Sequence, residues 1–347
     1  MPMIAPRVYI IILNYNGWKD TVECLETVFR SDYPDYKVVV ADNNSTDDSI
    51  LRLKKWAEGD CSVESTQQQL SHLFVPPLRK PIPFLFFEAK SEANLPKMDK
   101  SRMVVLQTGK NLGYAAGNNE AIKYALSQGD CDYIWILNND VVVETDALAK
   151  VVEHAETTRK RGFKIGLTGS KILYYKHPSI LQAAGGGPCD EWTGRSWQKG
   201  DGEKDIGQYD NDSAQLDYIL GAAVLVPTAF LRDVGLMCED YFLFAEERDW
   251  AIRGRRKDWL LNYAYLSRIY HKDAGSMNRE NGGDRGLLDF YMMRSRVIFA
   301  KKFFPRRLWF VRACILISFL KRICRGEFST LPFVARAMLF KVNNSLD

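Results

Sequence analysis

Apolar runs and amphipathic helical patterns alternate along the first 160 residues, and this alternation constrains the fold more than any other feature of the chain. Four segments, at residues 7–13, 36–45, 101–108 and 132–140, begin with the composition of buried strands. A stretch with helical periodicity follows each of them. Strand–helix alternation of this kind predicts an α/β fold with a mostly parallel central sheet flanked by helices.

Later segments complete the expected sheet and its loops. "IGLTGSKILYY" (165–175) and "LDYILGAAVLV" (216–226) are expected strands, and a glycine-rich polar loop at 185–215 is of the kind that carries specificity. Proline-rich residues 57–100 interrupt the rhythm between the second helix and the third strand. We interpret them as an insertion, either a surface loop or a flap or docking surface.

Polar residues collect where the expected strands end. The first strand leads into Asn14-Tyr15-Asn16-Gly17, the second into Asp42-Asn43-Asn44-Ser45 and the fourth into Asn138-Asn139-Asp140, while "GKNLGYAAGNN" follows the third. Ligands of open α/β sheets bind at this edge. It would offer acceptors for a base, amides for phosphates and one carboxylate suited to Mg²⁺ or Mn²⁺. Each motif alone is an ordinary turn signal, but together they predict a nucleotide diphosphate site.

These motifs make the chain resemble the family 2 glycosyltransferases of GT-A fold, and within them the rhamnosyltransferase-like branch. The matching segments stand in the family's order between residues 7 and 277: "VYIIILNYNGWKDTVECLETV", "YKVVVADNNSTDDS", "GKNLGYAAGNNEAI", "YIWILNNDVVVETDAL", "LDYILGAAVLVPTAFLRDVGLMCEDYFLFAEERDWAIR" and "YHKDAGS". The resemblance implies a GT-A catalytic domain at residues 1–285, with the insertion at about 57–100. We expect a basic, apolar helical extension at residues 286–347.

The resemblance implies a metal site at the end of the fourth strand. The family carries a D-x-D-type motif there, and Asp140 matches its metal-binding acidic residue. Asn138 and Asn139 replace the other acidic positions, so the metal has one carboxylate where other members offer two or three. His271 matches a histidine that completes the metal site in some members, although a lone histidine is often structural. The expected cofactor is Mg²⁺ or Mn²⁺, and a neutral imidazole suits Mn²⁺ better.

The resemblance also implies which residues bind the nucleotide. Asp42 and Asn43 would accept the N3–H of a uracil or thymine ring. The other expected contacts line the same pocket, form the family's N-x-G turn or follow the fourth strand: Leu13, Asn14, Tyr15, Asn111, Gly113, Gly117, Asn118, Asn138 and Asn139.

A second chemical cluster lies in "YFLFAEERDWAIR" (241–253). Its three carboxylates, Glu246, Glu247 and Asp249, would also suit an ordinary helix start. The family has a Glu-Asp motif here, and Glu247 takes the place of its aspartate. The resemblance therefore implies Glu247 as the general base, with Glu246 and Asp249 orienting it or binding the acceptor. We expect Trp250 to be a core residue rather than an acceptor platform.

The implied reaction is transfer of a sugar with inversion in a single displacement. The resemblance implies dTDP-L-rhamnose as donor and a glycan or lipid-linked saccharide as acceptor, in cell-surface polysaccharide synthesis. A UDP-sugar donor and a non-catalytic nucleotide-sugar-binding relative are the alternatives. A dinucleotide-dependent dehydrogenase would need G-x-G-x-x-G after the first strand, where this chain has N-Y-N-G. The Gly-rich, Arg-containing start of a sugar nucleotidyltransferase is also absent.

Charge is concentrated near the C-terminus. The chain carries a net charge of +4, but residues 290–326 contain ten Lys or Arg and no Asp or Glu, so the remainder carries −6. No nucleic-acid motif accompanies these cations, and we expect no nucleic-acid partner. The apolar stretch 308–320 would be about 20 Å long as a helix, against about 30 Å for a bilayer core. We therefore expect peripheral membrane contact through 301–325, with packing on the domain or a dimer interface as alternatives.

The expected compartment is the cytoplasm, at the inner face of the cell membrane. The seven cysteines are scattered without a CxxC pair, which is typical of a reducing environment. "VYIIILNYNG" begins almost at once and has the pattern of a strand, so we expect no secretory signal.

Overall fold

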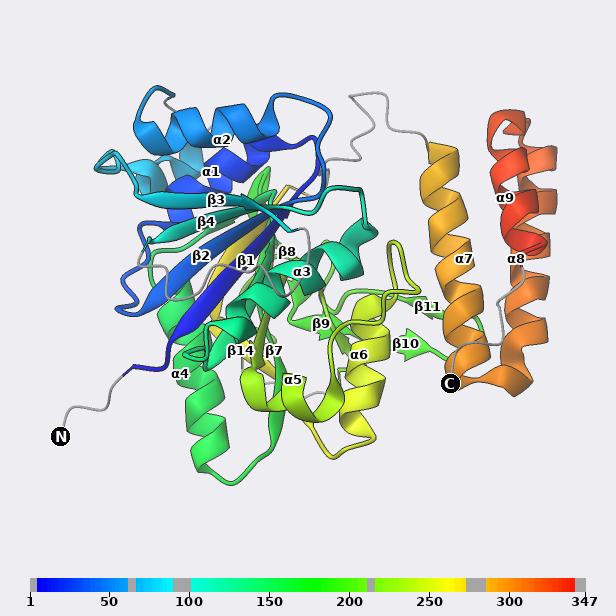
Figure 1. Cartoon of the computed structure of the whole chain (residues 1–347). Coiled ribbons are helices and arrows are strands. Elements are labelled where there is room, and N and C mark those ends of the chain that lie inside the picture. The colour runs from blue at the N-terminus through cyan, green and yellow to red at the C-terminus, as the bar shows by residue number, and fades with distance from the viewer. Residues whose placement is uncertain (1–4, 62–66, 90–100, 211–215, 273–284, 341–347) are drawn as a thin grey trace.

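A ten-stranded sheet forms the centre of the molecule, in the order β3-β4-β2-β1-β5-β13-β7-β14-β6, with β8 beside β7. The computed structural model describes residues 5–61, 67–89, 101–210, 216–272 and 285–340. The first five strands in this order run parallel: β3 (Phe84–Glu88), β4 (Met103–Gln107), β2 (Tyr36–Asp42), β1 (Val8–Asn14) and β5 (Tyr133–Asn138). The predicted α/β fold with a mostly parallel sheet is confirmed, and Figure 1 shows the sheet between its helices.

The other half of the sheet mixes both directions. β13 lies antiparallel between β5 and β7, β14 is parallel to β7, and β6 is antiparallel to β14. The bounds are β6 (Val141–Val143), β7 (Ile165–Tyr174), β8 (His177–Ala184), β13 (Ala223–Pro227) and β14 (Leu260–His271). In this register Val141 pairs with His271, so the end of β14 lies next to the residue before Val141, which is Asp140.

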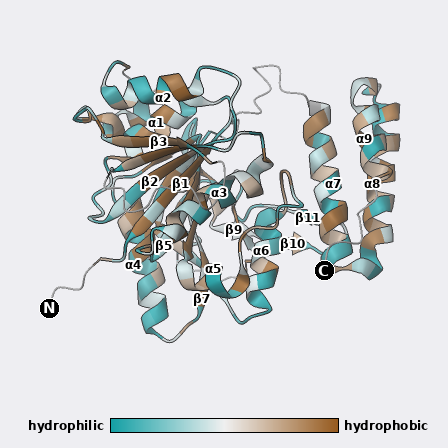
Figure 2. Ribbon diagram, viewed as in Figure 1, coloured by the Kyte–Doolittle hydropathy of each residue, from teal (hydrophilic) through white to brown (hydrophobic). Residues whose placement is uncertain are grey.

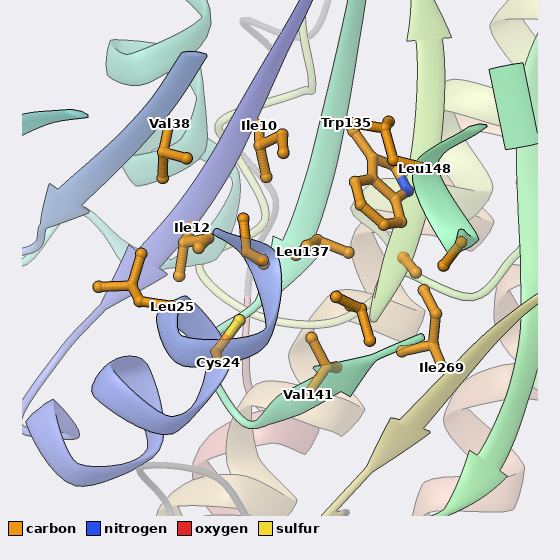
Figure 3. Packing of buried hydrophobic residues seen from close by; sticks show 14 of the residues in the cluster. Ile10, Ile12, Cys24, Leu25, Val38, Trp135, Leu137, Val141, Leu148 and Ile269 are labelled. Carbon is orange, nitrogen blue, oxygen red and sulfur yellow. The ribbon is translucent and has the colours of Figure 1, made fainter. Parts of the chain in front are cut away.

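Helices cover both faces because successive residues of a buried strand point to opposite sides. Ile10 and Ile12 pack with α1 (Trp18–Val28), α2 (Ser49–Glu58) and α4 (Ala147–Lys160), as Figure 3 shows for α1. Tyr9 and Ile11 pack with α3 (Gly113–Ser127), α5 (Thr228–Val234) and α6 (Glu246–Arg255). The apolar colour of the central strands in Figure 2 reflects this burial on both sides.

Two segments differ from the sequence-based expectation. Part of the predicted insertion is regular structure, because α2 runs to Glu58, η1 spans Gln68–Phe74, and β3 adds a parallel edge strand beside β4. The predicted single strand at 216–226 is divided into β12 (Tyr218–Ile219) and β13, with residues 220–222 between them. Short strands also occur in the predicted loop, at β9 (Gly186–Gly187), β10 (Cys189–Asp190) and β11 (Arg195–Ser196).

Three helices follow the sheet domain. They are α7 (Arg285–Phe303), α8 (Leu308–Cys324) and α9 (Leu331–Met338), with short 3₁₀ turns at Pro305–Arg307 and Phe328–Thr330. They share an apolar cluster, and in Figure 1 α7 stands nearest the sheet with α8 and α9 outside it. None of the described helices is both long and apolar enough to cross a bilayer. Residues 341–347 of the predicted extension lie outside the described residues.

Candidate active site

Asp140 and His271 meet at the carboxyl edge of the sheet. Asp140 Oδ1 lies 3.1 Å from His271 Nε2, and both side chains are buried. This is the distance of a direct hydrogen bond or ion pair, and it also fits joint coordination of a cation, because two atoms bound to one ion at about 2.1 Å can lie about 3.0 Å apart. Among the described residues, no group of three or more His, Cys, Asp or Glu is arranged to bind a metal. The residues after Lys272 in the motif "YHKDAGS" lie outside the described part of the chain.

The orientation of the His271 ring suits a metal ligand. Its Nδ1 lies 2.7 Å from Oε1 of Gln182, a buried residue of β8. Because an amide oxygen accepts a hydrogen bond, Nδ1 is the nitrogen that carries the proton. In the neutral ring Nε2 then presents its lone pair toward Asp140. A partner on the second nitrogen is the usual means of fixing a metal-binding histidine. Sequence reasoning missed Gln182, because it belongs to no motif.

Asn138 and Asn139 have different surroundings. Asn138 Nδ2 lies 3.3 Å from His271 Nε2, while its Oδ1 accepts a hydrogen bond from the Tyr114 hydroxyl at 3.2 Å. Asn139 donates to the Thr21 hydroxyl at 3.0 Å and to the Gly17 carbonyl at 3.3 Å. Asn138 therefore lies beside the predicted metal ligand His271. Asn139 instead hydrogen-bonds the turn after β5 to the start of α1.

The predicted base pocket is built on a buried hydrogen-bond network. Asp42 accepts hydrogen bonds from Asn14 Nδ2 at 2.8 Å, from Ser45 Oγ at 2.6 Å and from Ser45 N at 3.0 Å. Asn14 and Asp42 are both fully buried, while Leu13 and Tyr15 are half-buried. Because Asp42 and Asn14 are fully buried and bonded to each other and to Ser45, they are not accessible to a base in this conformation, contrary to the prediction for Asp42, and only Leu13 and Tyr15 are partly accessible.

Asn43 organises the turn that leads into α3. Its Nδ2 donates to Asn111 Oδ1 at 3.0 Å and to the Gly113 carbonyl at 3.1 Å, and its Oδ1 accepts from Leu112 N at 3.0 Å. Asn118 is buried one helical turn further on, and its Oδ1 has no hydrogen-bond partner among the described residues. The predicted N-x-G turn thus lies directly beside the end of β2.

Glycine is required at position 113 by its backbone conformation and by close approach, and Gly117 of α3 packs closely against a leucine side chain. Gly113 has φ +79°, and a Cβ there would lie 2.3 Å from the Phe242 carbonyl oxygen. A Cβ on Gly117 would lie 2.7 Å from Leu13 Cδ1. The backbone N–H of Tyr114 donates to the Phe242 carbonyl at 2.7 Å. The start of α3 is therefore joined to the segment that precedes Glu246 and Glu247.

That segment enters α6 through an unusual backbone conformation. Phe244 and Ala245 have φ of 67° and 73°, a region that costs non-glycine residues about 1–3 kcal/mol each. Such residues cluster at functional sites. The turn buries Glu246 and leaves Glu247 half-buried at the N-terminus of α6. Glu247 lines a small cavity together with Tyr114, Gly221 and Trp250.

The two adjacent glutamates differ in their environment. Burial, and then the neighbouring Glu247 carboxylate, raise the pKa of Glu246 well above its ordinary value. Its Oε2 is buried without a hydrogen-bond partner among the described residues. Arg248 donates to the Gly194 carbonyl at 2.7 Å. Its Nε is 4.0 Å from Glu247 Oε1, so its contact with that carboxylate is weak. Of the two, Glu247 is the more accessible carboxylate.

Asp249 forms ion pairs with two basic side chains of the protein. It is fully buried, with Arg253 Nε 2.6 Å from Oδ1 and Lys302 Nζ 2.7 Å from Oδ2. Tyr241 also donates its hydroxyl to Oδ2 at 3.2 Å. Trp250 is buried too, donates to the Gly235 carbonyl and packs against Phe230, so its expected core position is confirmed. Through these contacts Asp249 stabilises the position of α6.

Tyr114 is a site residue that the sequence did not single out. Its hydroxyl lies 2.8 Å from the Gly221 carbonyl as well as 3.2 Å from Asn138 Oδ1. Burial, followed by the charges of Glu246, Glu247 and Asp140, raises its pKa well above the ordinary value. Tyr114 therefore stands between the Asp140–His271 pair and the glutamates. Its presence in "GKNLGYAAGNN" was the available signal, since that motif begins the helix facing the strand ends.

Comparison with known proteins bears on the family and the fold of this chain. The family model described as "Glycosyl transferase family 2" matches residues 9–69 and 89–185. The low-salt glycan biosynthesis hexosyltransferase Agl10 of Haloferax volcanii is 20% identical over 222 residues, covering 61% of this chain and 66% of that protein. The chain therefore spans just under two thirds of the length of this curated relative.

Two solved structures share the fold at low sequence identity. The mannosyltransferase PcManGT from Pyrobaculum calidifontis, in complex with GDP-Man and Mn²⁺, aligns with a TM-score of 0.51 and 14% identity over 97% of this chain and 75% of that one. GalNAc-T7 with UDP, GalNAc and Mn²⁺ aligns with a TM-score of 0.53 and 13% identity over 77% of this chain and 44% of that one. The chain therefore has the GT-A fold, and over residues 9–69 and 89–185 it resembles glycosyl transferase family 2.

Proposed function

We propose that this protein is an inverting, metal-dependent hexosyltransferase that moves a sugar from a nucleotide donor to a saccharide acceptor. The observation that carries the proposal is the pairing of Asp140 with His271 at 3.1 Å on the carboxyl edge of the sheet. The Tyr114 hydroxyl binds Asn138 beside this pair, and Tyr114 and Glu247 contact the same small, mostly apolar cavity. The proposed cation site and the proposed base, Glu247, lie on either side of Tyr114. A hydroxyl that displaces a diphosphate needs both, a base for its proton and a cation for the leaving group.

In the proposed reaction the acceptor oxygen forms a bond to C1 of the donor sugar while the bond from C1 to the diphosphate oxygen breaks. The diphosphate leaves with that electron pair, and Glu247 takes the proton of the acceptor hydroxyl. Attack opposite the leaving group inverts the anomeric carbon. Glu246, whose raised pKa favours its neutral form, places no second negative charge beside the base.

Asp140 and His271 would bind Mg²⁺ or Mn²⁺, and the cation would offset the charge that develops on the departing diphosphate. Gln182 fixes the ring of His271 for this role. With only two protein ligands, such a cation would remain open to diphosphate and water oxygens. The Mn²⁺ in the two solved structures of the same fold supports a divalent cation here.

The proposed donor is dTDP-L-rhamnose, with a UDP-sugar as the alternative. Leu13 and Tyr15 would contact the base, while the turn that Asn43 organises, with Asn111, Gly113 and Asn118, would lie under the nucleotide. The support is the resemblance of these segments to the rhamnosyltransferase-like branch. The proposed acceptor is a glycan or lipid-linked saccharide used in cell-surface polysaccharide synthesis, at the inner face of the cell membrane.

A donor screen tests the proposal against a binding-only protein. Release of nucleotide from dTDP-rhamnose, UDP-glucose, UDP-galactose and GDP-mannose is measured in Mg²⁺, in Mn²⁺ and in chelator. We expect metal-dependent release from one donor, fastest with dTDP-rhamnose. Tight binding of a nucleotide sugar without release, even with a range of saccharide acceptors, would instead identify a non-catalytic relative.

A further inference from the structure

Helix α8 is apolar on two opposite sides, but the described part of the chain covers only one of them. Val311 and Ile315 are fully buried in the cluster shared with α7 and α9. A helix that is apolar all round is normally buried all round. Here large apolar residues on the side opposite Val311 and Ile315 are exposed.

The outer face of α8 consists of Trp309, Leu316, Ile317, Leu320 and Ile323. Their exposed fractions are 64%, 43%, 51%, 51% and 42%. Trp309, Leu316, Leu320 and Ile323 are seven, four and three residues apart, so they form one stripe along the helix. Contiguous exposed apolar surface of this kind marks a protein or membrane contact.

Cations flank this stripe. Arg306, Arg312, Lys321 and Arg325 are exposed, and residues 290–326 contain no acidic residue. Within the described residues Arg306, Lys321 and Arg325 form no ion pair, whereas Arg307 and Arg322 are paired with Glu191 and Asp289. The outer face is therefore an apolar stripe with unneutralised positive charge on its margins, which complements anionic lipid head groups.

A second copy of the chain fits this surface less well. In a two-fold dimer the same patch meets itself, so the cations beside each stripe would face the cations of the partner. Acidic residues that could neutralise them are absent from residues 290–326. A bilayer with anionic lipids supplies both the apolar phase and the counter-charge.

We infer that the outer face of α8 docks on a bilayer that contains anionic lipid, lying in the plane of the interface. An aromatic group extends this surface toward the sheet domain, because Trp192 packs edge-on against Phe310, which does the same against Trp309. Trp192 is 51% exposed, and tryptophan is favoured at membrane interfaces. It belongs to the loop at 185–215, so docking places that loop at the lipid surface.

Docking would also bring the base near the membrane. Arg248 of α6 donates to the Gly194 carbonyl, in the same loop as Trp192, and Arg296 of α7 donates to the Thr193 carbonyl. A lipid-linked acceptor anchored beside Trp192 would thus lie close to the helix that carries Glu247. This consequence rests on the proposed function, whereas the lipid contact itself does not.

Vesicle flotation tests the lipid contact. The full chain is mixed with phosphatidylcholine vesicles, with or without phosphatidylglycerol, and the fraction that floats is measured at low and high salt. We expect strong flotation only with phosphatidylglycerol, reduced by salt. The double variant Leu316→Glu/Leu320→Glu should lower partitioning at least about tenfold, and Lys321→Glu/Arg325→Glu by about tenfold or more. The matched control Phe163→Glu changes an apolar residue of the sheet domain that is 50% exposed and lies between α4 and β7, outside the proposed lipid contact, and it should float like wild type.

Several results would overturn the inference. These are failure of the wild type to float with either vesicle, equal flotation of the α8 variants and wild type, or a dimer in solution that Leu316→Glu/Leu320→Glu dissociates without any vesicle binding. Circular dichroism checks that the variants are folded. Nucleotide release without vesicles is measured in parallel, because the proposed function would fail there even if flotation succeeds.

Discussion

Lys302 Nζ lies 2.7 Å from Asp249 Oδ2, and this ion pair joins helix α7 of the C-terminal extension to helix α6, which begins with Glu246 and Glu247. Ser295 of α7 also donates its hydroxyl to the Leu243 carbonyl, in the strained turn before α6. The extension is therefore part of the support of the proposed base as well as a candidate lipid-binding element.

Lys302→Met should weaken this support. It leaves the buried Asp249 with Arg253 and Tyr241 alone, at a cost of about 1–3 kcal/mol in the free energy of unfolding. We expect a lower kcat with an unchanged dissociation constant for the nucleotide, because Lys302 is not near the predicted nucleotide pocket. Lys302→Arg should recover much of the loss. The control Lys176→Met removes an exposed lysine of the sheet domain and should behave as wild type. Equal stability and kcat of Lys302→Met and wild type would show that the pair has no such role.

Asp140→Asn should abolish specific Mn²⁺ binding, and His271→Ala should weaken it by a smaller factor, because the histidine is the neutral ligand of the pair. Calorimetric titration with Mn²⁺, with and without nucleotide diphosphate, measures both. His154→Ala is the matched control, since His154 is a histidine that hydrogen-bonds to Asn262 and has no predicted metal role. Wild-type Mn²⁺ affinity in Asp140→Asn would place the cation elsewhere.

Glu246→Gln should change how stability depends on pH. Because the folded-state pKa of Glu246 is raised, the unfolded chain loses this proton near pH 4.3 while the folded chain retains it. Wild type therefore loses stability as the pH rises above that value, until the folded-state carboxyl also ionises. The glutamine variant lacks this contribution and should gain stability relative to wild type between pH 4 and pH 8. Denaturant unfolding at both pH values measures the difference. A constant difference across this range would mean that the pKa of Glu246 is not raised.

Tyr114→Phe should reduce turnover while leaving the fold intact. It removes the hydroxyl that reaches both Asn138 and Gly221, and leaves the ring in place. We expect a loss of about 0.5–1.5 kcal/mol in stability, together with weaker Mn²⁺ binding because Asn138 loses a fixed partner next to His271. Unfolding curves and Mn²⁺ titration check the two parts, and Tyr265→Phe, whose hydroxyl forms no hydrogen bond within the described chain, serves as control. Unaltered Mn²⁺ affinity and turnover would make Tyr114 a purely structural residue.

The strand–helix order of the first 160 residues was predictable because local periodicity reports burial directly. Runs such as "VYIIIL" are apolar on both faces, as a central parallel strand requires. The division of 216–226 into two strands was not predictable, because "LDYILGAAVLV" is continuously apolar. The structure uses the break after Ile219 to present the Gly221 carbonyl to Tyr114.

The candidate site was predictable only where a motif has a family counterpart. Asp140 and His271 are separated by most of the sheet in sequence, and they meet only through the β6–β14 register. Gln182 contacts His271 from another strand, and no local pattern predicts this contact. Tyr114 stands in a motif, but its contacts with Asn138 and Gly221 depend on the fold. Asp249 shows the converse. Its place among three carboxylates suggested a chemical role, but it is buried and paired with Lys302, which lies on a helix more than 50 residues away.

Glu247→Gln tests the central claim most directly. The variant keeps the size of the side chain and its hydrogen-bonding capacity but cannot accept a proton. Steady-state nucleotide release with the best donor and acceptor should fall on the order of 10²–10⁴-fold, while calorimetry should show unchanged binding of the nucleotide product and of Mn²⁺. Glu247→Asp should retain more activity than Glu247→Gln, and Glu246→Gln and Asp249→Asn should lose less. Wild-type turnover in Glu247→Gln, with an inactive but folded Glu246→Gln or Asp249→Asn, would contradict the assignment of the base.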